Sequence, residues 1–155
     1  MVASRERVAE YLSKSGAEFQ LRDFDESTKN SSLAARVLGC TVAEIAKSVV
    51  FVGRQTVVVV ISGDRRVDQG KLARATGEAL RIAKPDEVRT RTRYTIGGVP
   101  PFPHDPEIVV FLDESLERFD HVWAAAGTPN SVFRIGTRDL LRLVGRGSHD
   151  LAEQR

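Results

Sequence analysis

Two apolar runs near the middle of the chain most constrain its fold. Residues 48–52 and 56–61 are almost entirely β-branched or apolar, and Gly53, Arg54 and Gln55 separate them. Two such runs joined by a short glycine-containing connection predict a β-hairpin. Neither run alternates between apolar and polar residues, so both faces of each strand should be covered by other parts of the protein. The hairpin is therefore predicted to lie at the centre of a sheet.

Helical and extended patterns alternate around this hairpin. Apolar spacing and capping residues predict helices over residues 4–15, 31–38, 41–46, 68–76, 85–91 and 137–144. Short apolar runs predict further strands over residues 18–24, 79–83, 108–112, 122–126 and 131–135. This mixed order predicts the α+β class, with one mixed sheet and helices packed around it.

The size and composition of the chain indicate a single domain. It has 155 residues, of which 41% are hydrophobic and 28% charged, and this suits a globular protein with its own core. We predict one domain over residues 1–144, followed by a polar, frayed tail over residues 145–155. The N-terminal residues do not form a secretory signal, and no apolar run could span a bilayer. A cytoplasmic protein with no membrane partner is therefore expected.

Charge is unevenly distributed along the chain. The net charge is only +2, but residues 65–93 contain nine basic and four acidic residues. Residues 105–120 contain six acidic residues and one arginine. The basic segment predicts either a surface that contacts nucleic-acid phosphates or simply the solvated faces of two helices.

Lys47 is the first candidate functional residue. It stands at the start of the first buried strand, where the alternation of side chains points it to the same side as Val49 and Phe51. An ammonium group that faces an apolar interior costs free energy unless it has a partner. A phosphate, carboxylate or carbonyl of a ligand could be that partner. Alternatively, the side chain reaches solvent at the edge of the sheet.

The second candidate is the irregular segment 94–105, which contains two adjacent glycines and three prolines. Gly97 and Gly98 allow close approach of a ligand to the backbone, and Pro100 and Pro101 stiffen the second half of the segment. Such a loop suits a preformed set of N–H donors for an oxyanion or carboxylate, or it is an ordinary tight connection. Residues 125–130 form a turn by composition, and their small side chains could form the wall of a pocket.

Several classes of site have no support in the sequence. The chain contains neither a P-loop nor a Gly-x-Ser-x-Gly nucleophile motif. His104, His121 and His149 do not have metal-ligand spacing with the single cysteine, Cys40. Cys40 itself is expected to be a small buried residue. We therefore predict no metal and no other cofactor.

Taken together, the motifs resemble the YbaK/prolyl-tRNA-synthetase-associated editing domain family. The similarity lies in their order and spacing, and it extends over almost the whole chain. The matching segments are residues 31–40, 44–51, 61–64, 68–72, 97–102, 108–116 and 126–128.

The resemblance implies a fold, an activity and a set of site residues. The implied fold is one mixed, partly barrel-like sheet flanked by helices. The implied activity is hydrolysis of the ester that links an amino acid to the 3′-terminal adenosine of mischarged tRNA, without a metal. Lys47 would be the essential catalytic residue, and backbone groups of Gly97 and Gly98 would hold the aminoacyl group. The full set of implied substrate-binding residues is Ser31, Ser32, Ser48, Gly97, Gly98, Val99, Pro100, Pro101, His104, Gly127 and Thr128.

The resemblance defines the partners and the accepted amino acid less narrowly than the fold and the activity. Mischarged aminoacyl-tRNA is the expected partner, and association with an aminoacyl-tRNA synthetase is left open. Asn30 stands where the family commonly has threonine, and Arg93 and Pro103 stand where it commonly has glycine. These differences bear on which amino acid is accepted, and a pocket lined by Ser31, Val99 and His104 would suit a small one. The alternatives are a non-catalytic module that binds tRNA ends or acyl ligands, and a hydrolase of other small esters or amides.

Overall fold

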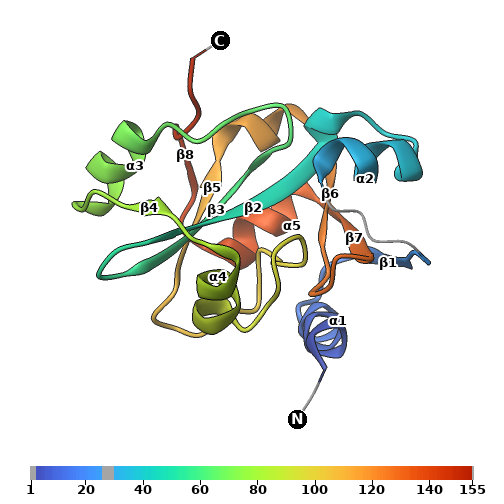
Figure 1. The fold of residues 1–155 in the computed structure, drawn as a ribbon. Coiled ribbons are helices and arrows are strands. Elements are labelled where there is room, and N and C mark those ends of the chain that lie inside the picture. Colours follow the sequence, from blue (N-terminus) through green and yellow to red (C-terminus); the bar gives the residue numbers. More distant parts are fainter. Residues whose placement is uncertain (1–2, 26–29, 155) are drawn as a thin grey trace.

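The fold was obtained as a computed structural model, which describes residues 3–25 and 30–154 (Figure 1). It contains one mixed eight-stranded sheet surrounded by helices. The strands are β1 (Phe19–Asp23), β2 (Ile45–Val52), β3 (Thr56–Ser62), β4 (Arg81–Ile82), β5 (Val109–Asp113), β6 (His121–Ala125), β7 (Ser131–Gly136) and β8 (Ser148–His149). The helices are α1 (Ser4–Lys14), α2 (Ser31–Leu38), α3 (Gln69–Thr76), α4 (Pro85–Thr92) and α5 (Thr137–Val144), with 3₁₀ turns η1 (Val42–Glu44) and η2 (Glu114–Arg118).

The sheet is mixed and open. Its strands follow the order β1-β7-β6-β2-β3-β5-β8, and β4 pairs with β2 outside this path. The β2–β3 pair is antiparallel, whereas β2 with β6 and β3 with β5 are parallel. Within the described residues the two ends of this order do not pair, so the barrel-like sheet is not closed. The predicted α+β class with a single mixed sheet is confirmed.

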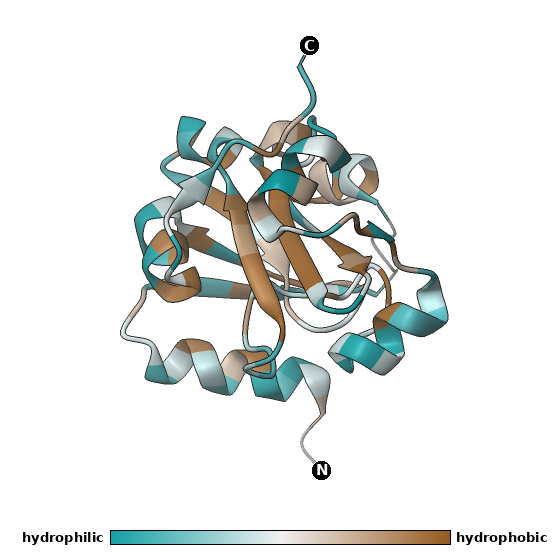
Figure 2. Ribbon diagram, turned by 90° about the vertical axis from the view of Figure 1, so that its left-hand side faces the viewer, coloured by the Kyte–Doolittle hydropathy of each residue, from teal (hydrophilic) through white to brown (hydrophobic). Residues whose placement is uncertain are grey.

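The central position predicted for the hairpin is also confirmed. Every residue of β3 is buried. One face of the hairpin, which includes Val58 and Val60, packs in the core with α1, α4 and α5, and the other face packs against Leu72 of α3. Figure 2 shows these apolar strands between helices with hydrophilic outer faces. Strand β2 differs from β3 because residues 47–49 are only partly buried, and this interruption lies at the candidate site.

The predicted helix over residues 41–46 is wrong in extent. Glu44 does accept a hydrogen bond from the Thr41 N–H, at 2.9 Å, as a capping pattern requires. The helical turn nevertheless ends at Glu44, and Ala46 already pairs with Ser62 of β3. Sheet pairing therefore overrides the local helical signal.

Within the predicted frayed tail, residues 148–152 are held against the sheet. Ser148–His149 pairs with β5 as β8, and the Leu151 side chain is only 1% exposed. The Leu151 N–H donates to the buried Asp113 carboxylate at 2.7 Å. A buried carboxylate requires such donors, and this requirement fixes the segment in place. None of the helices in the described part of the chain has both the length and the hydropathy of a membrane-spanning segment.

Candidate active site

A cavity of about 420 Å³ opens beside the edge of β2. The pairing of β2 with β6 ends at Ala46, and its pairing with β4 begins at Phe51. In the described sheet, residues 47–49 therefore have no strand beside them at this edge. The cavity occupies the gap and is closed by the start of α2, the turn after β3, the loop that follows α4, and strands β6 and β7. Its size lies within the range of small-molecule sites.

Lys47 supplies the charge of this cavity. Among the described lining residues, Lys47 is the one with a charged side chain. The others are glycine, apolar residues, or residues with a hydroxyl or amide group. Within residues 3–25 and 30–154, Lys47 makes neither an ion pair nor a side-chain hydrogen bond, so the ammonium group is available to a ligand. Burial lowers the pKa of Lys47, the charge of Arg66 lowers it further, and the charge of Asp64 opposes both. The half-buried Lys47 side chain thus lies at the edge of the sheet, as one of the two predictions had it, and this edge borders the cavity.

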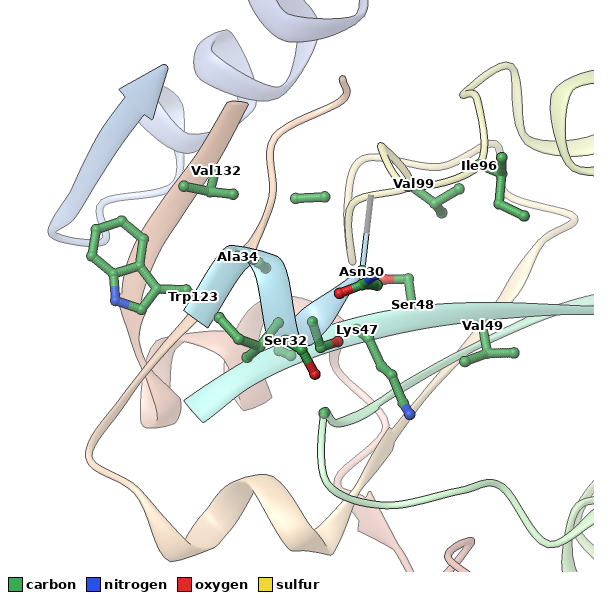
Figure 3. Close-up of a pocket in the computed structure, with 17 residues that line it drawn as sticks. Asn30, Ser32, Ala34, Lys47, Ser48, Val49, Ile96, Val99, Trp123 and Val132 are labelled. Atoms are coloured by element: carbon green, nitrogen blue, oxygen red, sulfur yellow. The ribbon is translucent and has the colours of Figure 1, made fainter. Parts of the chain in front are cut away.

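Ser48 contributes a hydroxyl from the other side of β2. Figure 3 shows Ser48 directed toward the loop that carries Ile96 and Val99, whereas Lys47 extends from the opposite side of the strand. The Ser48 Oγ atom is buried and has no hydrogen-bond partner among the described residues. A buried hydroxyl without a partner is costly, and such an atom in a cavity wall indicates that a ligand or water satisfies it.

The glycine loop contains a tight turn over residues 95–98. The Gly98 N–H donates to the Thr95 carbonyl at 2.9 Å, and Gly97 has φ +84°, a value that favours glycine at the third position of such a turn. The N–H of Gly98 is therefore used inside the loop and does not face a ligand. In the described part of the chain the Gly97 N–H has no internal acceptor, so Gly97 alone of the two glycines offers the expected donor.

Gly98 has a different role, which is close packing. A Cβ atom at Gly98 would lie 2.8 Å from Thr128 Cα, and one at Gly127 would lie 2.6 Å from the Ser4 carbonyl oxygen. The turn at residues 127–128 is thus held between the glycine loop and the start of α1. Gly98, Gly127 and Thr128 do not line the cavity but fix the position of the loop that does.

His104 and Pro101 lie outside this cavity. Both border a second one, of about 250 Å³, between the loop, α1 and α5. His104 Nε2 lies 2.7 Å from the buried Pro100 carbonyl oxygen, and the imidazole packs edge-on against Tyr94. Burial lowers the pKa of His104. Of the three residues expected to share a pocket, Ser31 and Val99 line the first cavity, whereas His104 borders the second.

The structure brings together six of the residues predicted from the sequence and adds several that were not foreseen. Gly63 lines the cavity, and a Cβ there would lie 2.9 Å from Ser31 Cβ, so glycine allows the start of α2 to approach the end of β3. Trp123 and Val132 form the far wall (Figure 3). A glycine directly after a buried strand was a usable signal, but nothing local distinguished Trp123. The predicted residues in the lining are Ser31, Ser32, Lys47, Ser48, Gly97 and Val99.

The basic segment does not form one uniform surface. Among the described residues, four of its nine basic side chains are ion-paired: Arg65 with Asp64, Lys71 with Asp150, Arg81 with Glu87, and Arg93 with Asp105. Arg66 of this segment contributes to the lowered pKa of Lys47. No group of three or more His, Cys, Asp or Glu side chains in the described part of the chain is arranged to hold a metal ion.

Comparison with known proteins gives a consistent result. The sequence model of the aminoacyl-tRNA editing domain matches residues 25–143. The chain is 35% identical to YwhH of Bacillus subtilis over 141 residues, which are 88% of each protein. It is 26% identical to EbsC of Enterococcus faecalis, a candidate Cys-tRNA(Pro)/Cys-tRNA(Cys) deacylase, over 77% of this chain and 75% of that one. The crystal structure of a proposed trans-editing enzyme for prolyl tRNA synthetase shares 39% identity and a TM-score of 0.89 over 99% of both chains.

Proposed function

The chain belongs to the aminoacyl-tRNA editing domain family, and we propose that it is a hydrolase that removes the amino acid from mischarged tRNA. The observation that carries this proposal is the cavity itself. In it, one lysine and one buried hydroxyl, neither with a partner among the described residues, lie between otherwise neutral walls. The relatives named as a trans-editing enzyme and as a Cys-tRNA deacylase support the same reaction.

In the proposed reaction, water attacks the carbonyl carbon of the aminoacyl ester. The bond between that carbon and the 3′ oxygen of the terminal ribose breaks, and a proton from the water ends on the departing oxygen. The products are the free amino acid and tRNA with a 3′ hydroxyl. The ammonium of Lys47 stabilises the negative charge that develops on the carbonyl oxygen, and the N–H of Gly97 hydrogen-bonds the bound aminoacyl group from the loop side. Ser48 hydrogen-bonds the bound ester and orients it. Because an aminoacyl ester is already reactive, positioning supplies much of the rate.

The other proposed site residues divide into two groups. Ser31, Ser32 and Val99 contact the substrate from the cavity wall. Gly98, Pro100, Pro101, His104, Gly127 and Thr128 hold the glycine loop in place.

The walls of the cavity indicate the chemistry of the amino acid. Apart from Lys47 they carry no charge in the described residues, and Trp123 and Val132 close one end. A small, uncharged side chain fits such walls, because a charged one would be buried without a partner. Arg66, an exposed residue of the basic segment, is the proposed contact for a phosphate near the tRNA 3′ end. Translation produces this substrate, so the proposed place of action is the cytoplasm.

The deciding experiment is deacylation of a panel of mischarged tRNAs by the wild type and by Lys47→Met, which keeps the length of the side chain. We expect at least one tRNA to be deacylated, and the variant to be slower by about 10²–10³-fold, as when one oxyanion donor is removed. Lys14→Ala is the matched control, because Lys14 is 75% exposed and pairs with Glu10 on α1.

Each assignment can fail separately. If the wild type deacylates no charged tRNA, the hydrolase assignment is wrong, and retained tRNA affinity would then identify a non-catalytic binding module. If Lys47→Met matches the wild type on a tRNA that is hydrolysed, the reaction stands but the site is misassigned.

A further inference from the structure

Strands β1, β7 and β6 have one face in the core and one face turned away from it. Ala124 of β6 pairs with Phe133 of β7, and both are buried in the core with α1 and α5. Side chains alternate along a strand and directly paired residues share a side, so the neighbouring positions face the other way. We call this side the outer face and define it by two rows of paired residues beside the cavity. One row is Gln20, Arg134 and Trp123, and the other is Arg22, Val132 and Ala125.

The outer face is covered at its β6 end and open at its β1 end. Trp123 is partly buried, because it packs with Ala34 and Ala35 of α2. Toward β1, by contrast, Gln20 and Arg22 are exposed. Figure 1 shows α1 and α2 on opposite sides of these strands. The β1 end of the outer face is therefore accessible to a partner.

The outer face continues into the active-site cavity. Trp123 and Val132 belong to both, and Figure 3 shows them at the end of the cavity away from Lys47. Ile45 of β2 pairs with Trp123, so Lys47, two residues further along β2, points to the same side of the sheet. Arg22 pairs with Val132 and lies three strands away from β2. At about 4.8 Å per strand, Arg22 is on the order of 15 Å from Lys47.

The outer face is positively charged at its open end. Its two rows contain two arginines and no carboxylate. Among the described residues neither Arg22 nor Arg134 has an ion-pair partner, and the Arg22 guanidinium lies over the Phe24 ring, 5.3 Å from its centre. The pKa of Glu44 is lowered first by hydrogen bonds from Thr41, at 2.9 and 2.8 Å, and more weakly by the charge of Arg134. Both guanidinium groups are thus available to an anionic partner.

We propose that the outer face binds the unpaired 3′ end of tRNA, with Arg22 and Arg134 in contact with its phosphates and Trp123 stacked on a base near the cavity. Proteins bind single-stranded nucleic acid through such a combination, in which basic side chains follow the phosphates and aromatic side chains stack on bases. The separation of Arg22 from Lys47 is one that a few nucleotides can span. The choice of RNA as the partner rests on the proposed function. The contact proposed for Arg66 is a separate one, because Arg66 follows β3 on the other side of β2.

Binding of uncharged tRNA tests the surface without any hydrolysis. The measurement is the Kd of total uncharged tRNA as a function of salt concentration, by filter binding, for the wild type, Arg22→Gln, Arg134→Gln and the double variant. One phosphate contact to a single strand contributes a slope of about 0.7 in log Kd against log salt. Each single variant should lose about that slope. Between about 1 M and 0.1 M salt this slope amounts to roughly fivefold in affinity, so at 0.1 M we expect losses of about fivefold in each single variant and about 25-fold in the double variant.

Arg138→Gln is the matched control. Arg138 is exposed and has no ion-pair partner among the described residues, but it lies on α5, which packs on the core face of the sheet. This change removes the same charge from the other side of the sheet, so the Kd and the salt slope should stay at the wild-type values. Arg134→Lys keeps the charge and should keep most of the slope. If it loses as much as Arg134→Gln, Arg134 acts through packing and is not a phosphate contact. Arg22 is exposed on an edge strand, so Arg22→Gln decides the test if Arg134→Gln does not fold.

Total uncharged tRNA from which the unpaired 3′ nucleotides have been removed locates the contact. We expect the wild type to bind this shortened tRNA more weakly, and the double variant to bind it as the wild type does. Trp123 is the single tryptophan of the chain, and its fluorescence should be quenched by intact tRNA only. The proposal is wrong if the double variant keeps the wild-type Kd and slope for intact tRNA. It is also wrong if the double variant loses the same affinity for the shortened tRNA, because the face would then contact another part of the molecule.

Deacylation separates this proposal from the proposed function. If mischarged tRNA is hydrolysed with the same KM by the wild type and the double variant, the function stands and the outer face is not the surface that binds tRNA. If no tRNA is hydrolysed but binding responds as expected, the outer face stands and the hydrolase assignment fails. Where both proposals hold, the double variant should raise KM by more than it lowers kcat, because neither arginine contacts the ester.

Discussion

The contact between Gly98 and Thr128 makes a sharp test of how the glycine loop is held. In Gly98→Ala the new methyl carbon would lie 2.8 Å from Thr128 Cα, 2.9 Å from its carbonyl carbon and 3.0 Å from its nitrogen. Ordinary carbon contacts are about 3.5–4.0 Å long, so the two backbone segments must separate by roughly 0.7 Å or more. Neither can move easily, because a Cβ on Gly127 would already meet the start of α1.

The expected loss of stability is about 1–3 kcal/mol, the usual cost of overpacking. For a chain of this size this corresponds to a fall in Tm of roughly 3–10 °C. The same displacement moves the Gly97 N–H, so kcat/KM for deacylation should fall by about 10–100-fold, because a shift near 1 Å in a catalytic group has effects of this size. Thermal unfolding followed by circular dichroism and a deacylation assay measure the two effects.

Gly136→Ala is the control for the same change without the overlap. Gly136 has φ −65°, and the nearest atom to an added Cβ is the Asp120 carbonyl oxygen, at 3.8 Å. It should cost less than about 1 kcal/mol and leave deacylation unchanged. The reasoning is refuted if Gly98→Ala retains wild-type Tm and activity, or if Gly136→Ala is equally damaging.

Three further outcomes are expected. Ser48→Ala should raise the free energy of unfolding by about 1 kcal/mol and slow deacylation, because it removes a buried hydroxyl that has no hydrogen-bond partner among the described residues; a fall in stability in urea unfolding, or wild-type activity in the deacylation assay, would contradict this. Removal of residues 145–155 should lower the urea midpoint, since burial of Leu151 alone contributes about 1.5–3 kcal/mol; an unchanged midpoint would show that the segment is dispensable. Hydrogen bonds from Arg118 lower the pKa of Asp64 to about 2, so the ionised Asp64 carboxylate stabilises the fold above its unfolded pKa of about 4, and this stabilisation is lost as the pH falls through 2. The urea midpoint should therefore fall less steeply between pH 5 and 2 in Asp64→Asn than in the wild type. Equal slopes would show that Asp64 does not contribute to the acid sensitivity.

The parts of the fold that were predictable are those set by local pattern. The unbroken apolar runs of the β2–β3 hairpin required cover on both faces, and β3 is buried throughout. The predictions that were wrong concern segments whose conformation depends on residues far away in the sequence. Residues 45 and 46 carry a helical signal but pair with β3 and β6. Residues 148–151 are held by partners far away in the sequence, since β8 pairs with β5 and the Leu151 N–H donates to the buried Asp113 carboxylate.

In the candidate site, too, the residues with a local sequence signal were predictable and those placed by the sheet topology were not. Lys47 and the glycine loop stood out locally, as a charge at the start of a buried strand and as adjacent glycines followed by prolines. Trp123 and Val132 did not stand out, because they reach the cavity only through the order of β6 and β7 in the sheet. His104 lies only five residues after Val99 but borders the second cavity, a difference that depends on the path of the loop and not on a local pattern.

The position of the cavity at the edge of β2 constrains how any substrate can bind. Adjacent residues of a strand point to opposite faces, so Lys47 and Ser48 cannot both contact a ligand that lies flat on one face of the sheet. A ligand that reaches both must lie across the unpaired edge of β2, where residues 47–49 have no neighbouring strand in the described sheet. That geometry holds only while the register that pairs Lys47 with Ile61 is kept, because a shift by one residue would exchange the ammonium and the hydroxyl. The packing of β2 opposes such a shift, since it would exchange Val50 and Phe51, which differ in size, between two closely packed cores. The buried hairpin that makes the fold recognisable from its sequence is therefore also what holds the two candidate groups in place.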